Sequence, residues 1–497
     1  MKPTITMRRA LKDPKLFGPI LKGPSWLGWR ALLIASMGEK LTAEEREAFA
    51  RLTGRLAEPG ERVDEFWGVV GRRGGKSRAS SVLAVYLAAL CEHPNVAVGE
   101  KPIVLFIAEN QKQAAICFNY ASGILEATPL LRELVVGRTQ DTISLANGVS
   151  LEIRAASFRG LRGPTFLACV ADEAAFYAVD DAVNADTEVL NAVRPGLATT
   201  GGPLIVISSP YAKRGEVWGT FKRYYGSEGD PLILVAKGSS RDFNPSLSQK
   251  VVDRAYERDA AAAAAEFGGE FRSDLERFIS LEVVEGCVPR GCYERAPASG
   301  VIYFGFCDPS GGSDDSMTLA ITHRDRDGRA ILDVLRERRP PFSPENVVAE
   351  FAQLLKSYRL VRIEGDHYAG AWPIERFRIH GITYEPCARP KSELYADLLP
   401  LLNSGRCELL DHRRLVDQLV ALERRTGRTG KDTTSHPPNA HDDVCNAAAG
   451  ALVRVYAGRS STAEMMKLIT PALLARTRFG PFTNRSIPHS TRTRVFG

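Results

Sequence analysis

The chain has 497 residues, of which 44% are hydrophobic and 25% charged, an ordinary balance for folded globular domains. This length favours roughly two to four domains, and the net charge of +6 permits a polyanionic partner without requiring one. No apolar run approaches the ~18 residues that cross a membrane, and the start has no apolar core behind its charges, so we expect neither a membrane span nor a signal peptide. The nine cysteines include no pair at metal-ligand spacing, and we expect reduced thiols.

A glycine loop with a lysine and a serine follows the first candidate core strand. The run 64–70, DEFWGVV, predicts a buried strand, and 76–91 has apolar residues at helical spacing. Between them stands GRRGGKS, 71–77, which lacks the first glycine of the usual phosphate-loop pattern. In such a loop Lys76 would reach the β- and γ-phosphates and the Ser77 hydroxyl would ligate Mg²⁺. A glycine-rich turn that caps a helix is the alternative interpretation.

An acidic pair ends a later apolar run, 166–176, FLACVADEAAF. Before it, 102–108 predicts another buried strand and 142–156 predicts a hairpin about an Asn-Gly turn. A phosphate-loop ATPase needs one acid to hold Mg²⁺ through water and a second to orient the attacking water. Asp172 fits the first role and Glu173 the second. The alternative is an acid that caps a helix after a strand.

Two further segments flank these acids. The run 203–210, PLIVISSP, predicts a strand that ends in Ser208 and Ser209. In motor ATPases such a segment senses the γ-phosphate; a strand before a proline turn is the alternative. The loop 158–165, FRGLRGPT, carries Arg162. An arginine at a γ-phosphate stabilises transition-state charge, whereas a solvated loop or a DNA-phosphate contact is the alternative.

The pattern of elements changes after the segment 261–282, where an alanine-rich helix and two glycines predict the join between domains. We then expect three antiparallel strands, a helix, a strand, a helix, a strand and further helices. The segments that carry this pattern are 301–308, 316–325, 330–338, 344–355, 360–366, 382–386, 391–402, 413–423 and 439–452. This order is the plan of ribonuclease-H-like nucleases.

Aspartates stand where that plan needs carboxylates. Asp308 ends the first strand, Asp366 ends the fourth, and Asp442 and Asp443 lie in the first turn of the last helix. Two divalent ions about 4 Å apart activate water and stabilise the leaving oxygen at a phosphodiester. Clustered carboxylates repel one another without cations, so we predict a metal-dependent nuclease site. For each aspartate alone, a cap or turn role is the alternative.

In motif order, from about residue 20 to residue 455, the chain resembles the large terminase subunit of tailed bacteriophages and related gene-transfer particles. The segments that match are VVGRRGGKS, ACVADEAAF, VISSP, GEF and HDDVCNAAAG. In that family the phosphate loop often lacks its first glycine and carries arginine instead. The resemblance implies an N-terminal ATPase that translocates double-stranded DNA into a procapsid, and a C-terminal nuclease that cuts concatemers.

The resemblance also implies a role for each site residue. The nucleotide-binding set would be Arg72, Arg73, Gly74, Gly75, Lys76, Ser77, Asp172, Ser208 and Ser209, with Ser77 and Asp172 on Mg²⁺. Glu173 would complete hydrolysis, and Arg162 is the candidate arginine finger given to a neighbouring subunit. The nuclease acids would be Asp308, Asp366 and Asp443, with Asp442 competing with Asp443 as the metal ligand.

The expected fold class is α/β: a P-loop ATPase domain with a mainly parallel sheet, then a ribonuclease-H-like nuclease domain. The expected extents are a helical lid 1–60, motor 61–262, linker 263–298, nuclease 299–457 and basic tail 458–497. Implied ligands are ATP with Mg²⁺ and two Mg²⁺ or Mn²⁺ ions. Implied partners are double-stranded DNA, a portal protein, a small terminase subunit and further copies in a ring, in the host bacterial cytoplasm and transiently at the portal.

Two other functions are compatible with the same motifs. A helicase with a fused nuclease would need a second motor lobe, and the nuclease plan occupies that length here. A DNA-binding scaffold with a dead nucleotide pocket would not need Lys76, Asp172 and Glu173, which are all present.

Overall fold

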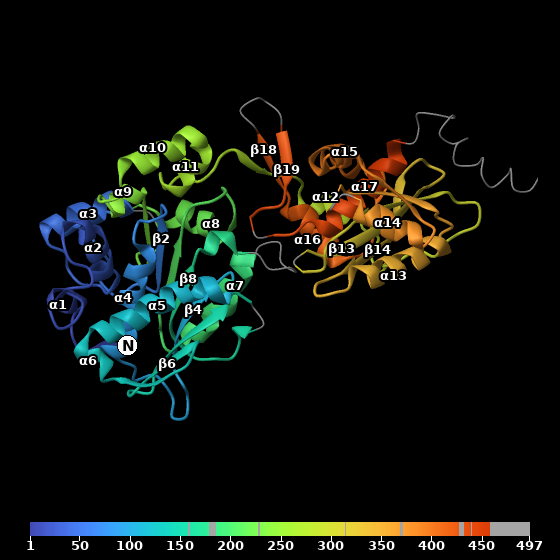
Figure 1. The fold of residues 1–497 in the computed structure, drawn as a ribbon. Helices are drawn as coiled ribbons and strands as arrows, with labels where there is room; N and C mark the ends of the chain where they lie inside the picture. The colour runs from blue at the N-terminus through green and yellow to red at the C-terminus, as the bar shows by residue number, and fades with distance from the viewer. Residues whose placement is uncertain are drawn as a thin grey trace, which may run out of the picture.

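The computed structural model describes residues 1–157, 160–177, 185–226, 229–313, 315–367, 371–426, 432–438 and 440–457. Within these ranges two α/β bodies follow one another along the chain, each built around its own sheet (Figure 1). The basic tail 458–497 lies outside the described residues. Across the described ranges, no helix is both long and apolar enough to span a bilayer.

The sheet of the N-terminal body has eight strands within the described residues. They are β2 (Glu65–Val70), β4 (Ile103–Ala108), β5 (Val135–Arg138), β6 (Thr142–Leu145), β7 (Ser150–Ala155), β8 (Phe166–Asp172), β9 (Leu204–Ser208) and β10 (Ile233–Gly238). Their order is β10-β2-β9-β8-β4-β7-β6-β5, parallel from β10 to β7 and antiparallel beyond. The hairpin about Asn147-Gly148 is confirmed as β6–β7. Strands β5 and β10 are additional to those expected.

Helices cover both faces of this sheet. They are α1 (Met7–Lys12), α2 (Leu27–Ser36), α3 (Ala43–Thr53), α4 (Lys76–Ala89), α5 (Gln111–Ala127), α6 (Pro129–Arg132), α7 (Ala185–Ala198), α8 (Gly215–Tyr224), α9 (Ser240–Phe243), α10 (Gln249–Arg258) and α11 (Ala260–Glu266). Short elements are β1 (Lys2–Pro3), β3 (Cys91–Glu92) and the 3-10 turns at Pro24–Trp26 and Ala174–Phe176.

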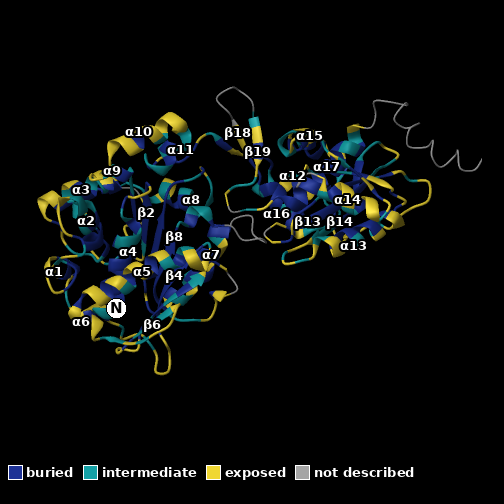
Figure 2. Cartoon of the chain, viewed as in Figure 1, coloured by how far each residue is buried: buried dark blue, intermediate teal, exposed yellow. Residues whose placement is uncertain are grey.

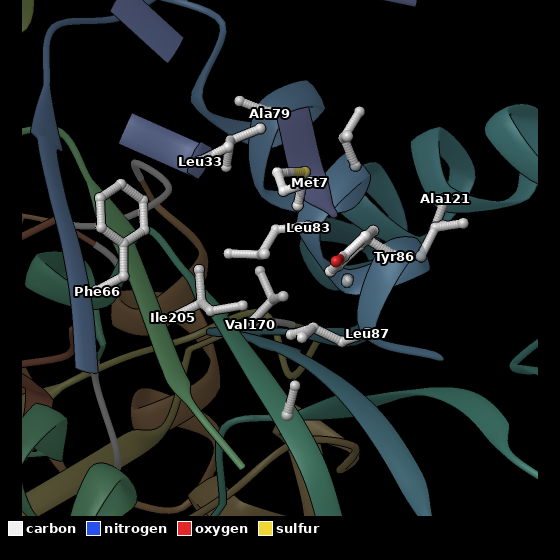
Figure 3. Close-up of a cluster of buried hydrophobic side chains, with 14 of the residues drawn as sticks. Met7, Leu33, Phe66, Ala79, Leu83, Tyr86, Leu87, Ala121, Val170 and Ile205 are labelled. Carbon is white, nitrogen blue, oxygen red and sulfur yellow. The ribbon is translucent and has the colours of Figure 1, made fainter. Parts of the chain in front are cut away.

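Helix α4 is buried on nearly all sides, because it lies between the sheet and the N-terminal helices. Figure 3 shows Leu83 of α4 between Ile205 and Val170 of the sheet and Leu33 of α2. Side chains interdigitated in this way leave little room for a helix to shift. The start of α4, where the glycine loop ends, is therefore held in a fixed position. Figure 2 shows that the strands of the sheet are buried, whereas outer helices such as α10 carry exposed residues.

The C-terminal body contains a six-stranded sheet in the part of the chain that the structure describes. Its strands are β12 (Tyr303–Asp308), β13 (Met317–Arg324), β14 (Ala330–Arg338), β15 (Arg362–Gly365), β16 (Thr383–Pro386) and β17 (Cys407–Glu408). The order is β16-β15-β12-β13-β14-β17, with β12, β13 and β14 antiparallel and β15 and β16 parallel to β12. Three antiparallel strands extended on one side by two parallel ones form the expected ribonuclease-H-like sheet. The α/β fold class is confirmed.

The helices of this body are α12 (Leu281–Gly286), α13 (Pro344–Ser357), α14 (Trp372–Ile379), α15 (Lys391–Asn403), α16 (Arg413–Ala421) and α17 (Asp443–Ala457). Helix α17 packs across the central strands, where Gly450 meets the ring of Phe306: a Cβ there would stand 2.5 Å from ring atoms. This close approach brings the head of α17 to the ends of β12 and β15.

A small sheet connects the segment between the bodies to the C-terminal body. It pairs β11 (Leu275–Arg277), β18 (Glu423–Thr426) and β19 (Asp432–Ser435). The helix expected over 413–423 ends at Ala421, because residues after Leu422 pair with β11 instead. Nearby, Phe278 and Val284 are buried in the C-terminal core. Glu423 also contacts the N-terminal body, since its carboxylate accepts a hydrogen bond from Tyr211 Oη at 2.7 Å.

Candidate functional site

The glycine loop turns sharply between the end of β2 and the start of α4. Gly75 caps the helix with a φ of 86°, a backbone region that side chains rarely adopt. A Cβ at this position would also stand 3.0 Å from the ring of Trp26. Glycine is therefore required by both conformation and space. The amides that follow point out of the start of a buried helix, a geometry that binds phosphate.

Three side chains from outside the loop hold its carbonyl groups. Trp29 Nε1 donates to the Gly74 carbonyl at 2.7 Å, and Ser240 Oγ donates to the Arg72 carbonyl at 2.6 Å. Asn244 Nδ2 donates to the carbonyl of Arg73, between these two residues, at 3.0 Å. With its carbonyls fixed, the loop presents amides rather than oxygens to an anion. Sequence reasoning missed these three residues, and no local motif indicates them because they are remote in the chain.

Lys76 and Glu173 meet at the end of the sheet. Lys76 is buried, and its Nζ lies 2.8 Å from Glu173 Oε1 and 2.9 Å from Ser209 Oγ. The other carboxylate oxygen of Glu173 accepts the Ser209 amide at 2.9 Å. Ser208 Oγ accepts the Ala175 amide at 3.1 Å. The structure thus brings the loop lysine, the second acid and both serines of the β9 end into one cluster.

Asp172 is buried at the end of β8, 2% exposed. Burial and the neighbouring Glu173 charge raise the pKa of Asp172 to about 7, although Lys76 opposes the shift. Its Oδ2 accepts a hydrogen bond from the Cys117 thiol at 3.4 Å, whereas its buried Oδ1 has no partner among the described residues. An oxygen so placed fits a hard cation such as Mg²⁺, which takes oxygen ligands and favours the ionised carboxylate. Burial also raises the pKa of Cys117 well above its usual value, so the thiol keeps its proton.

The side chains of two predicted site arginines, Arg72 and Arg162, do not bind Lys76 or Glu173 within the described residues. Arg162 is exposed in the loop before β8, and no ion pair or hydrogen bond within the described ranges joins its side chain to Lys76 or Glu173. The Arg72 side chain pairs with Glu266 at 3.3 Å. The assignment of Arg162 as an arginine finger stays a prediction.

The second cluster lies in the C-terminal body, at the end of β12. Asp308 closes that strand and Asp366 follows β15, with the Asp366 amide bound to the Cys307 carbonyl at 3.0 Å. Asn446 of α17 donates through Nδ2 to Asp308 at 2.8 Å and to Asp366 at 3.0 Å. Its own Oδ1 is buried and without a partner among the described residues. Sequence reasoning missed Asn446, although its position three residues after Asp443 puts both on one helix face.

The electrostatics of this cluster favour bound cations. Burial raises the pKa of the Asp308 carboxyl well above its usual value. The Asn446 hydrogen bond acts in the opposite direction, and the charges of Asp366 and Asp443 raise the pKa further. Divalent cations would offset this repulsion and favour the ionised form of the carboxyl groups. The donor set therefore fits metal ions.

Helix α17 begins at Asp443, so Asp442 precedes the helix and does not lie in its first turn as expected. The two aspartates also have different surroundings. Asp442 is buried, and its carboxylate is bound by Lys391 Nζ at 3.0 Å and Tyr395 Oη at 2.9 Å. Asp443 Oδ2 accepts the Ser316 amide at 3.1 Å, and burial raises the pKa of Asp443 to about 6.

Asp443 also belongs to a group that could hold a metal ion. Asp315, His441 and Asp443 each place one ligand atom within 4.8 Å of the others. Sequence reasoning missed Asp315 and His441. An acid in the loop between two strands and a histidine before a helix have many structural uses, so neither indicates a metal site by itself. Asp443, rather than Asp442, therefore has a carboxylate available to a cation.

Several solved structures are similar to this chain. The crystal structure of the HK97 bacteriophage large terminase is 18% identical, with 79% of this chain and 91% of that chain covered and a TM-score of 0.35. The chain resembles bacteriophage large terminases. A large terminase from a thermophilic bacteriophage is 12% identical, covering 82% and 98%, with a TM-score of 0.35. The large terminase nuclease of thermophilic phage G20c is 18% identical, covering 34% and 95%, with a TM-score of 0.30.

No protein-family model matches the sequence, and the search of curated proteins found no match. At TM-scores of 0.35 and below, the likeness transfers no residue roles. The roles proposed below come from the contacts of this chain.

Proposed function

We propose that the chain is the large subunit of a viral terminase. ATP hydrolysis in the N-terminal body drives double-stranded DNA into a procapsid, and a metal-dependent endonuclease in the C-terminal body cuts concatemeric DNA. The observation that carries this proposal is that one chain holds both clusters: Lys76 with Glu173 and Ser209, and Asn446 with Asp308 and Asp366. The proposed extents are 1–60, 61–262, 263–298, 299–457 and 458–497 for lid, motor, linker, nuclease and tail.

In the motor, the loop amides and Lys76 bind the β- and γ-phosphates of ATP. Ser77 and Asp172 would hold Mg²⁺, which neutralises phosphate charge when bound. A γ-phosphate competes with Glu173 for Lys76, because both are anions within reach of one ammonium group. Glu173 then keeps its bond to the Ser209 amide and orients the attacking water. Ser209 stands two residues before Tyr211, which contacts Glu423 of the C-terminal body.

In the nuclease, Asp308, Asp366 and Asp443 would hold two Mg²⁺ or Mn²⁺ ions, which supply water activation and leaving-group stabilisation. Asn446 fixes the orientation of Asp308 and Asp366 through one amide group. Because one nitrogen binds both carboxylates, a rotation of either side chain breaks the arrangement.

The proposed partners follow from packaging itself. They are double-stranded DNA, a portal protein, a small terminase subunit and further copies in a ring at the procapsid, within the host bacterial cytoplasm. The net charge of +6 allows phosphate contacts along a duplex. Binding should therefore weaken steeply as salt is raised.

One experiment tests the function as a whole. Phosphate release from ATP is measured with and without linear double-stranded DNA, and plasmid cleavage is measured with Mn²⁺, with Mg²⁺ and with EDTA. DNA-stimulated hydrolysis and metal-dependent cleavage are expected. Strand separation on a forked duplex would favour the helicase alternative, and absence of hydrolysis would favour the scaffold.

The adjacent aspartates at the start of α17, Asp442 and Asp443, should respond differently to substitution. Asp443→Asn is expected to lower plasmid cleavage by about 10²-fold, because it removes a charge available to the cations. Asp442→Asn should retain cleavage but unfold at lower denaturant concentration, since the buried bonds from Lys391 and Tyr395 weaken, at a cost of about 1–3 kcal/mol. Plasmid nicking and urea unfolding measure the two effects. The reverse pattern would assign Asp442 to the metals.

Arg162→Ala should lower ATP hydrolysis strongly in assembled rings and little in monomers. An arginine given to a neighbour's γ-phosphate acts only across an interface and can contribute ~10³-fold. Phosphate release is compared for both states. Mixing Arg162→Ala subunits with Lys76→Ala subunits should restore part of the activity. An equal loss in monomers and rings would mean that Arg162 acts within its own subunit.

A further inference from the structure

The buried thiol of Cys117 lies beside the two residues that would hold Mg²⁺, and the proposed hydrolysis does not use it. Cys117 is on α5 and 1% exposed. Its Sγ donates to Asp172 Oδ2 at 3.4 Å, and the hydroxyl of Ser77 also faces this sulfur. The thiol therefore lies between Ser77, where the glycine loop meets α4, and Asp172 at the end of β8.

The backbone that carries the sulfur is held by a contact between α4 and α5. Ser81 Oγ lies 2.7 Å from the Ser77 carbonyl and 2.8 Å from the Cys117 carbonyl. One hydroxyl thus binds both helices at the level of the site. A movement of α5 relative to α4 would disturb this bond, so the backbone of Cys117 keeps its place beside the start of α4.

The two oxygens of Asp172 are differentiated by this arrangement. The thiol binds Oδ2, whereas Oδ1 is buried and has no partner among the described residues. A carboxylate held at one oxygen cannot rotate freely, so the other oxygen keeps one direction. A ligand group prepared in this way loses less freedom when it engages a cation.

We propose that Cys117 is a positioning residue that orients Asp172 toward Mg²⁺. The proposal rests on the proposed ATPase function and extends it to a residue that no sequence motif indicated. Cys117 touches neither nucleotide nor reacting atoms, and it acts through the carboxylate of Asp172.

The test compares Cys117→Ala with a matched control, Cys169→Ala. Cys169 is another fully buried cysteine, on β8 three residues before Asp172, and burial alone raises its pKa. Binding of Mn²⁺ in the presence of ADP is measured by electron paramagnetic resonance, and ADP binding in EDTA by calorimetry. Thermal unfolding is recorded for each variant. The Mg²⁺ dependence of ATP hydrolysis is measured in parallel.

Cys117→Ala is expected to weaken Mn²⁺ binding about 10-fold, with ADP binding in EDTA unchanged, because partners of metal ligands typically contribute 10–100-fold. Cys169→Ala should bind Mn²⁺ as the wild type does. Cys117→Ser, which keeps a donor, should recover most of the affinity. Should Cys117→Ala not fold, Cys117→Val removes the donor while filling the space of the sulfur and should show the same loss.

Equal Mn²⁺ affinity in Cys117→Ala and Cys169→Ala would overturn the proposal. So would a Cys117→Ser variant as weak as Cys117→Ala, because the donor would then be irrelevant. These outcomes differ from a failure of the proposed function, in which the wild-type chain itself neither hydrolyses ATP nor binds Mn²⁺ with ADP.

Discussion

Asp308→Asn is expected to abolish DNA cleavage and to leave ATP hydrolysis at the wild-type rate. Asp308 ends β12 within hydrogen-bonding reach of Asn446, in a half-buried cluster with Asp366. Losing one negative charge there weakens the hold on both ions that cleavage requires, so we expect a loss of at least about 10²-fold. The measurement is nicking of supercoiled plasmid in Mn²⁺ or Mg²⁺, with phosphate release from ATP measured on the same preparation.

A matched control comes from the same domain. Asp327→Asn removes one charge from the exposed turn between β13 and β14, outside the cluster. It should cleave plasmid as the wild type does, and EDTA should stop cleavage in both. If Asp308→Asn still cuts plasmid with metal present, the nuclease assignment is wrong.

Glu173→Gln is expected to lose ATP hydrolysis by about 10²-fold or more while nucleotide binding persists. Glutamine has nearly the same size and can still accept the Ser209 amide, so the local backbone should be retained. It cannot form the ion pair with Lys76 or polarise an attacking water as a carboxylate does. Phosphate release measures the loss, and calorimetric titration with a non-hydrolysable ATP analogue measures binding.

Glu188→Gln is the control for this substitution, because Glu188 is an exposed acid on α7. Its hydrolysis should equal that of the wild type. Binding by Glu173→Gln should be no weaker than wild type, since Lys76 is released from its partner. Turnover near the wild-type rate would show that another group orients the water.

The local sequence determined much of the fold and the approximate place of both sites. The strand, glycine loop and helix around Lys76 follow from a continuous apolar run, a glycine cluster and helical spacing. The hairpin at Asn147-Gly148 follows from turn chemistry. Strand ends at Asp172 and Asp308 follow because an apolar run stops at a charge. Each of these signals lies within a short stretch of the chain, where backbone preference and burial act directly.

Tertiary structure alone decided which polar groups meet. Asn446 joins Asp308 from 138 positions away in the chain, and Asp366 from 80 positions away. Trp29 and Ser240 reach the glycine loop from opposite directions in the sequence. Asp442 and Asp443 are neighbours in sequence, yet the carboxylate of Asp442 is bound by Lys391 and Tyr395 and that of Asp443 by the Ser316 amide. Helix α16 ends at Ala421 because β18 pairs with β11. Such contacts depend on how whole sheets and helices pack, and a side chain's own sequence neighbourhood does not specify its distant partner.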